Sequence, residues 1–368
     1  MSSTHEKYAL SNILGRQNLV RLALIAATAG SVTATFAYAA GWLQGWKLTQ
    51  DAVIDRFEEV NGVHPGFRRN HAKGVCIEGY FDSNGNGAVL SFAKVFEPGR
   101  IPVEGRFAVA VGSPDIPDSG KQVRSMALRF RPANGEEWRT GMNDIPVFGV
   151  RDAAGFYDQL LAMKPDPATG KADPAKVSAF LAEHPESANA IALINAKPFS
   201  SGFDNATYNG LNAFDFIAAD GHVTSVRWSM QPTAPFEKEP ADAPADGNYL
   251  FDELVRKIDS TPLRWHFLLT VGQPGDVTND ATIAWPDDRE RIDAGVLTIT
   301  GVEAEDTGNC RDINFDPLVL PDGIRASDDP LLSARSAAYA VSFERRAGEP
   351  HSPSAVQPDE VAKANLDE

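Results

Sequence analysis

Apolar and polar residues alternate with a period of two over several short runs after residue 70. Such alternation is typical of strands with one buried face. Turn signals such as Asn84-Gly85 and Asn134-Gly135 separate the runs, and short connections of this kind favour antiparallel pairing. The strands predicted in this part of the chain are 75–81, 88–96, 106–111, 123–130 and 146–151.

A second set of segments has apolar residues at helical spacing. The predicted helices are 48–60, a segment around Phe156 to Leu161, a segment beginning at Pro174, and 249–258; further strands are 212–218, 223–230, 265–271 and 295–299. About eight strands in two groups close most simply as a barrel, because closure removes the exposed edges. We therefore predict an α+β fold, an eight-stranded antiparallel β-barrel with helical insertions.

The last predicted helix has clear start and stop signals. Asp329 is a suitable N-cap and Pro330 fits the first helical position, while Arg345 and Arg346 lie in the last turn before Gly348. Two further residues of this helix, Arg335 and Tyr339, are four apart. Side chains at that spacing share one face of a helix.

The N-terminus contains an apolar stretch, 22–46, with no charged residue, preceded by Arg16 and Arg21. It is long enough to span a bilayer, and basic residues before it keep an N-terminus cytoplasmic. Ala37-Tyr38-Ala39 also fits a signal-peptidase site. We expect residues 1–46 to be a signal peptide or signal anchor and the body to be periplasmic, free or membrane-anchored. The acidic, Pro- and Ser-rich tail, 347–368, is expected to be disordered.

Charge and cysteine content limit the partners. The formal net charge is −16, which argues against nucleic acid and against an anionic membrane face, so only the N-terminal segment is expected to meet a membrane. Cys76 and Cys310 can pair in an oxidising compartment, and two buried free thiols are an equally good interpretation. Neither has the CxxC neighbour of a structural zinc site.

A histidine stands at the start of the first predicted strand, in the order Arg68-x-x-His71-Ala72-Lys73-Gly74. Its unperturbed pKa lies near neutrality, which suits a proton shuttle. By itself, a histidine at a strand end is usually structural. The same holds for His266, the main competitor, which lies within the strand 265–271.

These two separate segments together resemble one family. The Arg68 to Gly74 motif, followed by Gly79-Tyr80-Phe81, resembles the distal-side motif of haem catalases, and Arg335-x-x-x-Tyr339 resembles their proximal haem-ligand motif. The resemblance covers about 50–346 and is greatest to the shorter, membrane-targeted catalase-related peroxidases. It implies one catalase-like haem-binding domain at 47–346, with the last helix carrying the haem ligand.

The resemblance implies haem b as cofactor, with Tyr339 as its iron ligand. A phenol must lose its proton to bind ferric iron, and the nearby Arg335 guanidinium would stabilise the phenolate. On the other face His71 would move the peroxide proton. By the same match Asn143 would hydrogen-bond the peroxide. The remaining cofactor-binding candidates are Phe148 and Phe156 as pocket walls and Arg68, Arg106 and Arg346 as partners of the haem carboxylates.

Some residues depart from the family pattern. Catalases carry a serine two residues after the arginine that matches Arg106, and it accepts a hydrogen bond from the distal histidine; here the residue is Ala108. We expect His71 to be less firmly oriented in consequence. Asn70 stands where large catalases have valine, which makes the distal side more polar. The long N-terminal arm and C-terminal helical domain of full-length catalases are also missing, so a monomer or dimer is expected.

These observations favour a haem b peroxidase that reduces organic hydroperoxides or hydrogen peroxide with electrons from a small reductant. One alternative is a true catalase, which dismutates hydrogen peroxide. The other is a non-catalytic barrel that binds haem or lipid.

Overall fold

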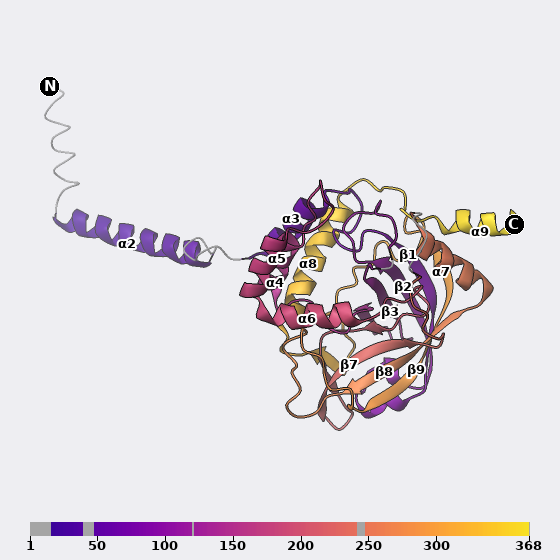
Figure 1. Cartoon of the computed structure of the whole chain (residues 1–368). Helices are drawn as coiled ribbons and strands as arrows, with labels where there is room; N and C mark the ends of the chain where they lie inside the picture. The colour runs from indigo at the N-terminus through magenta and orange to yellow at the C-terminus, as the bar shows by residue number, and fades with distance from the viewer. Residues whose placement is uncertain (1–15, 40–47, 120, 241–246, 368) are drawn as a thin grey trace. The chain divides into compact units, whose positions relative to one another are not determined.

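The computed structural model describes residues 16–39, 48–119, 121–240 and 247–367 (Figure 1). The chain divides into two units, Met1–Thr49 and Gln50–Glu368. The first contains one helix, α2 (Arg16–Ala39), whose stretch Asn18–Tyr38 is long and apolar enough to cross a membrane, as is also true of many signal sequences. Part of the predicted leader, residues 1–15 and 40–46, lies outside the described residues.

The second unit is built on a closed antiparallel barrel. Going round it, the strands follow the order β7–β5–β4–β3–β2–β1–β9–β8, and β8 pairs back to β7. Their bounds are β1 (Gly74–Ser83), β2 (Gly99–Val109), β3 (Arg124–Phe130), β4 (Trp138–Asn143), β5 (Tyr208–Asn209), β7 (Val223–Pro232), β8 (Leu263–Val271) and β9 (Arg291–Glu303). Two short strands, β6 (Phe214–Ile217) and β10 (Ile324–Ala326), extend the sheet beyond β7. The predicted eight-stranded closure is confirmed.

Aromatic side chains fill the inside of the barrel. Phe130, Trp138 and Phe267 stack with ring centroids 5.3 to 6.0 Å apart, and each is at most 1% exposed. Full burial of one such side chain contributes about 1.5 to 3 kcal/mol. The barrel interior is therefore a packed core, and any ligand site must lie on its outer face.

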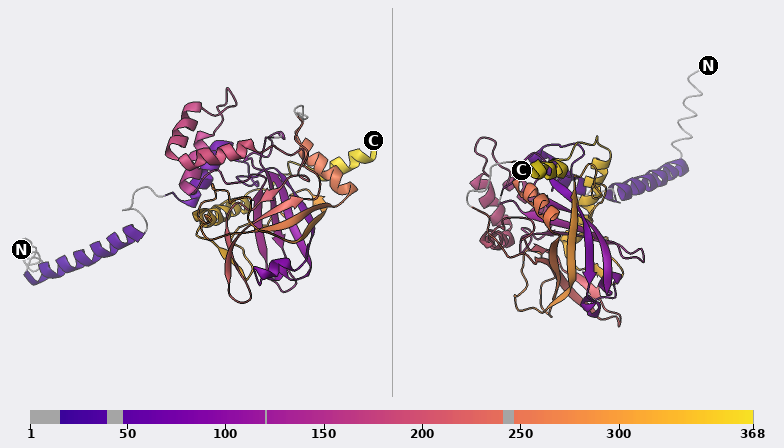
Figure 2. Two further views of the ribbon diagram at one scale, coloured as in Figure 1. Left: turned by 60° about the horizontal axis from the view of Figure 1, so that its bottom comes forward. Right: turned by 90° about the vertical axis from the view of Figure 1, so that its right-hand side faces the viewer.

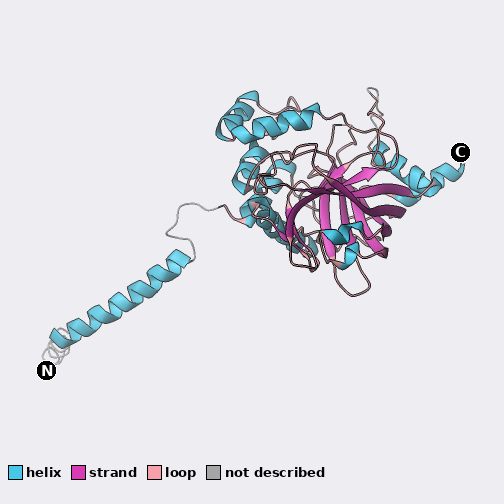
Figure 3. Cartoon of the chain, turned by 90° about the horizontal axis from the view of Figure 1, so that it is seen from below, coloured by secondary structure: helices cyan, strands magenta, loops and turns pink. Residues whose placement is uncertain are grey.

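Helices surround this barrel (Figure 3). The first group consists of α3 (Gln50–Asn61), α4 (Ala153–Ala162), α5 (Pro174–Glu183), α6 (Pro185–Ala196) and α8 (Pro330–Ala347). In two views these helices lie on one side of the strands, and α7 (Tyr249–Ser260) and α9 (Pro358–Asp367) lie on the other (Figures 1 and 2). Helix α8, which the sequence predicts as the last helix of the body, contacts both α3 and α4.

Three local predictions are wrong. The segment 88–96 contains two 3₁₀ turns, η1 (Asn86–Val89) and η2 (Lys94–Phe96), and 146–151 forms no strand, whereas the strand β4 was missed. In both wrong segments the apolar residues, such as Val95 and Val147, are buried by loops that pack on the barrel. Apolar residues that are buried in a loop therefore gave these two segments the same pattern as a strand. In strand β4 the inward-facing residues are Trp138, Thr140 and Met142, and the polar Thr140 among them hides the alternation.

Part of the tail, 347–368, for which the sequence predicts disorder, packs on the body in this structure; residue 368 lies outside the described residues. Val356 is fully buried, and the Ser354 hydroxyl donates to Asp306 at 2.8 Å. Helix α9 contacts α7 and β9. The composition of this segment is acidic and Pro-rich, but a few residues such as Val356 and Ser354 are enough to attach it to the body.

Candidate functional site

The strand register places two rows of side chains across the outer face of β1 to β4. Residues Val75, Phe107, Met126 and Met142, which pair across these strands, are at most 1% exposed and point into the core. Their neighbours point outward because successive side chains alternate between the faces of a strand. The first row consists of Gly74, Ala108, Ser125 and Asn143, and the second of Cys76, Arg106, Ala127 and Gly141.

His71 lies over the first row, held in an uncommon backbone conformation. Its φ of 56° is in the left-handed region, which costs a non-glycine residue of the order of 1 kcal/mol or more and needs support from its surroundings. That support includes the Asn70 side-chain oxygen, which accepts the His71 backbone N–H at 3.0 Å, and the next amide, Ala72, which donates to Val111 at 2.8 Å. The imidazole is thereby directed at β3.

One hydroxyl connects both distal candidates. Ser125 Oγ donates to Asn143 Oδ1 at 2.5 Å and lies 3.1 Å from His71 Nδ1. A hydroxyl has a single proton. Since that proton goes to Asn143, the bond with His71 needs a proton on Nδ1, which leaves Nε2 with a free lone pair. The same bond turns the Asn143 amide so that its NH₂ is free to donate.

The expectation that His71 lacks a hydroxyl partner is therefore wrong. Ala108 and Ser125 are cross-strand partners in the β2–β3 register. Paired side chains of adjacent antiparallel strands lie about 5 Å apart on the same face, so a hydroxyl supplied by either strand can reach the same imidazole. In this chain β3 supplies it.

The imidazole is neutral at ordinary pH. Burial lowers the pKa of His71 to about 3, assisted by the positive charges of Arg106, Arg335 and Arg68. His266, the competing histidine, instead pairs with Asp293 at 2.8 Å and has a side chain that is 44% exposed. It is a structural residue that bonds a neighbouring side chain at the surface, as the sequence suggests.

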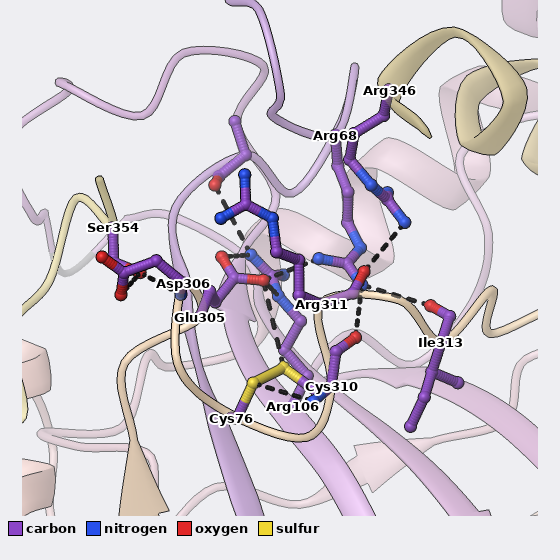
Figure 4. Close-up of a disulfide and its surroundings, with 11 residues drawn as sticks. Arg68, Cys76, Arg106, Glu305, Asp306, Cys310, Arg311, Ile313, Arg346 and Ser354 are labelled. Carbon is purple, nitrogen blue, oxygen red and sulfur yellow. Dashed lines mark hydrogen bonds and ion pairs between the residues drawn. A yellow bond between two sulfur atoms is a disulfide. The ribbon is translucent and has the colours of Figure 1, made fainter. Parts of the chain in front are cut away.

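Three arginines gather at one end of the second row (Figure 4). Arg106 reaches both oxygens of Glu305, at 2.6 and 2.7 Å, and Arg68 Nη1 reaches Glu305 Oε1 at 2.6 Å. Arg346, from the last turn of α8, donates to the backbone oxygen of Arg311 at 3.0 Å. The three predicted carboxylate-binding arginines are thus brought together, although they are up to 278 positions apart in sequence.

This arginine cluster carries excess positive charge. Burial works to raise the pKa of Glu305, but Arg106, Arg68 and Arg346 outweigh it and lower the pKa to about 2. Burial lowers the pKa of Arg346 to about 10, with a contribution from the positive charge of Arg106, although Glu305 acts in the opposite direction. One carboxylate against three guanidiniums leaves two positive charges without a counter-charge within the cluster. A ligand with two carboxylates would balance them.

The proximal candidates come from α8 and face the second row. Asp329 caps this helix by accepting the Leu331 N–H at 2.9 Å. Asn212 donates to Asp329 at 2.8 Å and accepts a hydrogen bond from Arg335, which ties the cap to the arginine. A Cβ atom placed on Gly141 would be 3.7 Å from Tyr339 Oη and 3.8 Å from Arg335 Nη2. The small second-row residues Ala127 and Gly141 therefore leave the space that these side chains face.

His71 and Tyr339 consequently lie against adjacent rows of one barrel face. His71 contacts the first row at Ser125, and Tyr339 points at the second row at Gly141. Residues two apart along a strand are separated by about 7 Å, which is more than the thickness of a flat aromatic ring. The arrangement has an imidazole on one side, a phenol on the other, and arginines at the end.

Phe148 and Phe156 lie in a neighbouring cluster. Their ring centroids are 6.1 Å apart, and Phe156 also contacts Phe57 of α3 at 5.5 Å. They pack with buried residues of the helical insertion, whereas Tyr339 packs with Cys76, Cys310, Ile313 and Phe315. Their predicted place in the pocket wall stays a prediction.

The profile of the Catalase family matches residues 38–363 of this sequence. This chain belongs to the Catalase family. Among curated relatives of this family, a catalase-related peroxidase of Synechococcus elongatus is 38% identical over 330 residues, which cover 89% of this chain and 95% of that protein. A second catalase-related peroxidase, from Mycolicibacterium paratuberculosis, is 33% identical, and the match covers 82% of this chain and 96% of that protein. The fold, the family and the similarity to short peroxidases are therefore confirmed.

Larger catalases match over part of their length. A catalase of Pseudomonas aeruginosa is 29% identical, and this chain spans 62% of it. Two solved structures share the fold: a bacterial catalase with TM-score 0.68 at 24% identity, and catalase A of Saccharomyces cerevisiae with TM-score 0.69 at 19% identity. The chain covers 62% and 66% of these two proteins.

Two residues of this site were missed from the sequence of this catalase-family chain. Ser125 carries no local motif, and only strand register shows that it faces Asn143. Glu305 lies in an irregular loop after β9. Its one available signal was the excess of predicted buried arginines, which requires a carboxylate nearby. The open question of the cysteines is also resolved, because Cys76 and Cys310 form a disulfide.

Proposed function

We propose that this protein is a haem b peroxidase that reduces organic hydroperoxides or hydrogen peroxide with electrons from a small reductant. The observation that carries the proposal is the placement of His71 and Tyr339 over adjacent rows of one barrel face. The proposal is supported by two relatives, both catalase-related peroxidases, which are 38% and 33% identical to this chain.

The residues present fit haem b in three respects. The arginine cluster lacks two negative charges, and haem b has two carboxylates. The outer face beside Tyr339 and Arg335 carries only the small residues Ala127 and Gly141, which suits the edge of a flat ring. The phenol of Tyr339 is the candidate iron ligand, because tyrosinate is a known axial ligand of haem and Arg335, which faces the same residue Gly141, would stabilise its anionic form.

When bound, haem supplies the iron at which the peroxide O–O bond is broken and the oxidising equivalents are held. His71 Nε2 takes the proton from the peroxide O–H group and returns it to the departing oxygen, which leaves as water or an alcohol. Asn143 donates its amide N–H to the peroxide. Ser125 holds both side chains in the required orientation, and burial keeps the imidazole neutral so that it can act as a base.

A second candidate is a hydrogen-peroxide-dismutating catalase. Ser125 favours this function, because it gives His71 the hydroxyl partner that the distal histidine of catalases has. The two functions differ in their products. With added hydrogen peroxide, a peroxidase oxidises a dye and releases little oxygen, whereas a catalase releases abundant oxygen.

One preparation tests the whole proposal. The purified protein, supplied with haem, is expected to show the absorption spectrum of a tyrosinate-bound ferric haem and to oxidise a small aromatic donor when peroxide is added. Absence of haem binding contradicts the proposal. Bound haem without turnover supports instead a non-catalytic haem carrier.

We also propose that the body is exported and meets a membrane through its N-terminal segment. Helix α2 has the length and composition of a membrane span or signal sequence. A disulfide in the second unit is typical of proteins that mature in an oxidising compartment.

A further inference from the structure

The Cys76–Cys310 disulfide lies directly beside the arginine cluster. Both cysteines are fully buried, and the bond joins residues 234 positions apart in sequence. In the strand register Cys76 pairs with Arg106, and Cys310 lies on the loop that carries Glu305. The bond thus connects the barrel strand next to an arginine with the loop that holds that arginine (Figure 4).

This loop supplies the acceptors for all three arginines. Glu305 binds Arg106 and Arg68. Backbone oxygens of Cys310 and Ile313 accept from Arg68 Nη2 at 3.0 and 3.2 Å. The backbone oxygen of Arg311 accepts from Arg346. The position of one segment, 305–313, therefore decides where three guanidinium groups point.

Segment 305–313 is held by hydrogen bonds and ion pairs instead of regular structure. Residues 304–323 contain no helix or strand, and loops of this length without regular structure are uncommon in compact domains. Besides its contacts with the arginines, the segment is attached to the tail by two reciprocal bonds between Asp306 and Ser354, N–H to Oγ and Oγ to Oδ1, each at 2.8 Å. Against β1 it approaches so closely that a Cβ atom on Gly308 would lie 2.9 Å from Cys76. The disulfide is the one covalent attachment there.

We propose that formation of the Cys76–Cys310 disulfide creates the tight binding site for the haem carboxylates, so that the chain retains its cofactor only after oxidation. The proposal rests on the proposed haem function. In the oxidation step the two thiols give up two protons and two electrons to the disulfide of an external thiol oxidant, which becomes a dithiol. The new S–S bond fixes segment 305–313, and with it the directions of Arg68, Arg106 and Arg346.

The test is the rate of haem transfer from the full-length protein to excess apomyoglobin, which reports haem loss without any turnover. In the Cys76→Ala/Cys310→Ala variant we expect haem loss to be at least about 10-fold faster, the scale found when residues that support ligands are removed. The Soret band of the haem that is still bound should stay that of the parent protein, because Tyr339 and Arg335 are kept; a shifted band would mean that lost packing against Tyr339, which contacts this cysteine pair, causes the effect, and would contradict the proposal.

Val75→Ala is the matched control. Val75 neighbours Cys76 on β1, is fully buried, and points into the core instead of the site. It lowers stability without moving the loop, so its haem transfer rate should stay within about 2-fold of the parent protein. Fast haem loss in this control as well would mean that general destabilisation causes the effect, and the proposal would be wrong.

A second measurement needs no variant. The unfolded, reduced parent protein is refolded with haem, with and without oxidised glutathione, and haem uptake is followed by the Soret absorbance. The proposal predicts retained haem only in the oxidised sample. Equal retention in both samples overturns it while leaving the haem function standing. No retention in either sample, with the disulfide verified, contradicts the haem function itself.

Discussion

At the scale of single residues, the distal side of the site depends on one hydroxyl. Ser125 lies between His71 and Asn143 and determines the tautomer of the first and the amide orientation of the second. A resemblance by position placed this function at residue 108, where the chain has alanine. The function is nevertheless present, because a neighbouring strand supplies the group.

Replacing Ser125 by alanine is expected to lower kcat/KM for peroxide by about 10- to 100-fold, the range for a catalytic group that loses its orientation. Haem binding should be unchanged, since Ser125 is not part of the arginine cluster. Ala108→Ser in the same variant should restore much of the lost activity, because residues 108 and 125 are paired. Full activity in the Ser125→Ala variant would show that the hydroxyl does not orient the base.

Tyr339 is the other residue with a sharp test. Tyr339→Phe removes the phenol oxygen while keeping the ring, so we expect a shifted Soret band or loss of haem from the purified protein. Tyr80→Phe is the control, because Tyr80 stacks under Arg100 in an exposed part of β1. An unaltered spectrum in the Tyr339 variant would remove it as the iron ligand.

At the scale of elements, helix α8 is positioned from its N-terminus. Asp329 both caps the helix and binds Asn212, and Asn212 holds Arg335. The cap therefore contributes to stability and also to the position of the proximal residues. The sequence predicted the cap and both ends of this helix correctly, because capping signals are local.

Asp329→Ala is expected to reduce the free energy of unfolding by about 1 kcal/mol, which lowers Tm by about 1 to 2 °C in a chain of this size. It should also disturb the haem spectrum, because Asn212 loses a partner. The control is Asp173→Ala, which removes the equivalent cap of α5 in an exposed position. It should lower Tm by a similar or smaller amount and leave the spectrum unchanged. Identical spectra in both variants would show that the cap serves stability alone.

At the scale of the whole molecule, the buried site makes the stability of the fold depend on pH. Burial and the arginines lower the pKa of His71 from 6.5 to about 3. The unfolded chain therefore takes up a proton on this residue at a higher pH than the folded protein does. Stability is lost as pH falls from about 6.5 towards about 3. Glu305, whose pKa is lowered to about 2, adds a further loss below about pH 4.5 by the same reasoning.

The haem-free protein is expected to lose up to about 1.4 kcal/mol of unfolding free energy per pH unit from His71 between pH 6.5 and 3. His71→Asn removes this titration and suits the left-handed backbone, in which asparagine is common. Its unfolding free energy, measured by denaturant titration, should therefore fall less steeply over the same interval. Equal slopes for the two proteins would mean that the pKa of His71 is the same in the folded and the unfolded chain.

Local signals in the sequence determined much of this protein: the helix caps, the strand alternation, and the motifs that contain His71, Arg335 and Tyr339. Each involves residues within a few positions of one another, where backbone geometry relates spacing directly to position in space. The barrel closure also followed, because unpaired strand edges are unfavourable.

Only the tertiary structure decided the rest. The hydroxyl from Ser125, the carboxylate of Glu305, the disulfide and the ordered tail all depend on contacts across strands or between distant segments. Such contacts follow from strand register and from the path of an irregular loop, and neither leaves a periodic trace in the sequence. The residues that would carry the chemistry could therefore be predicted from the sequence. The groups that position them, such as Ser125 and Glu305, could be identified only from the folded structure.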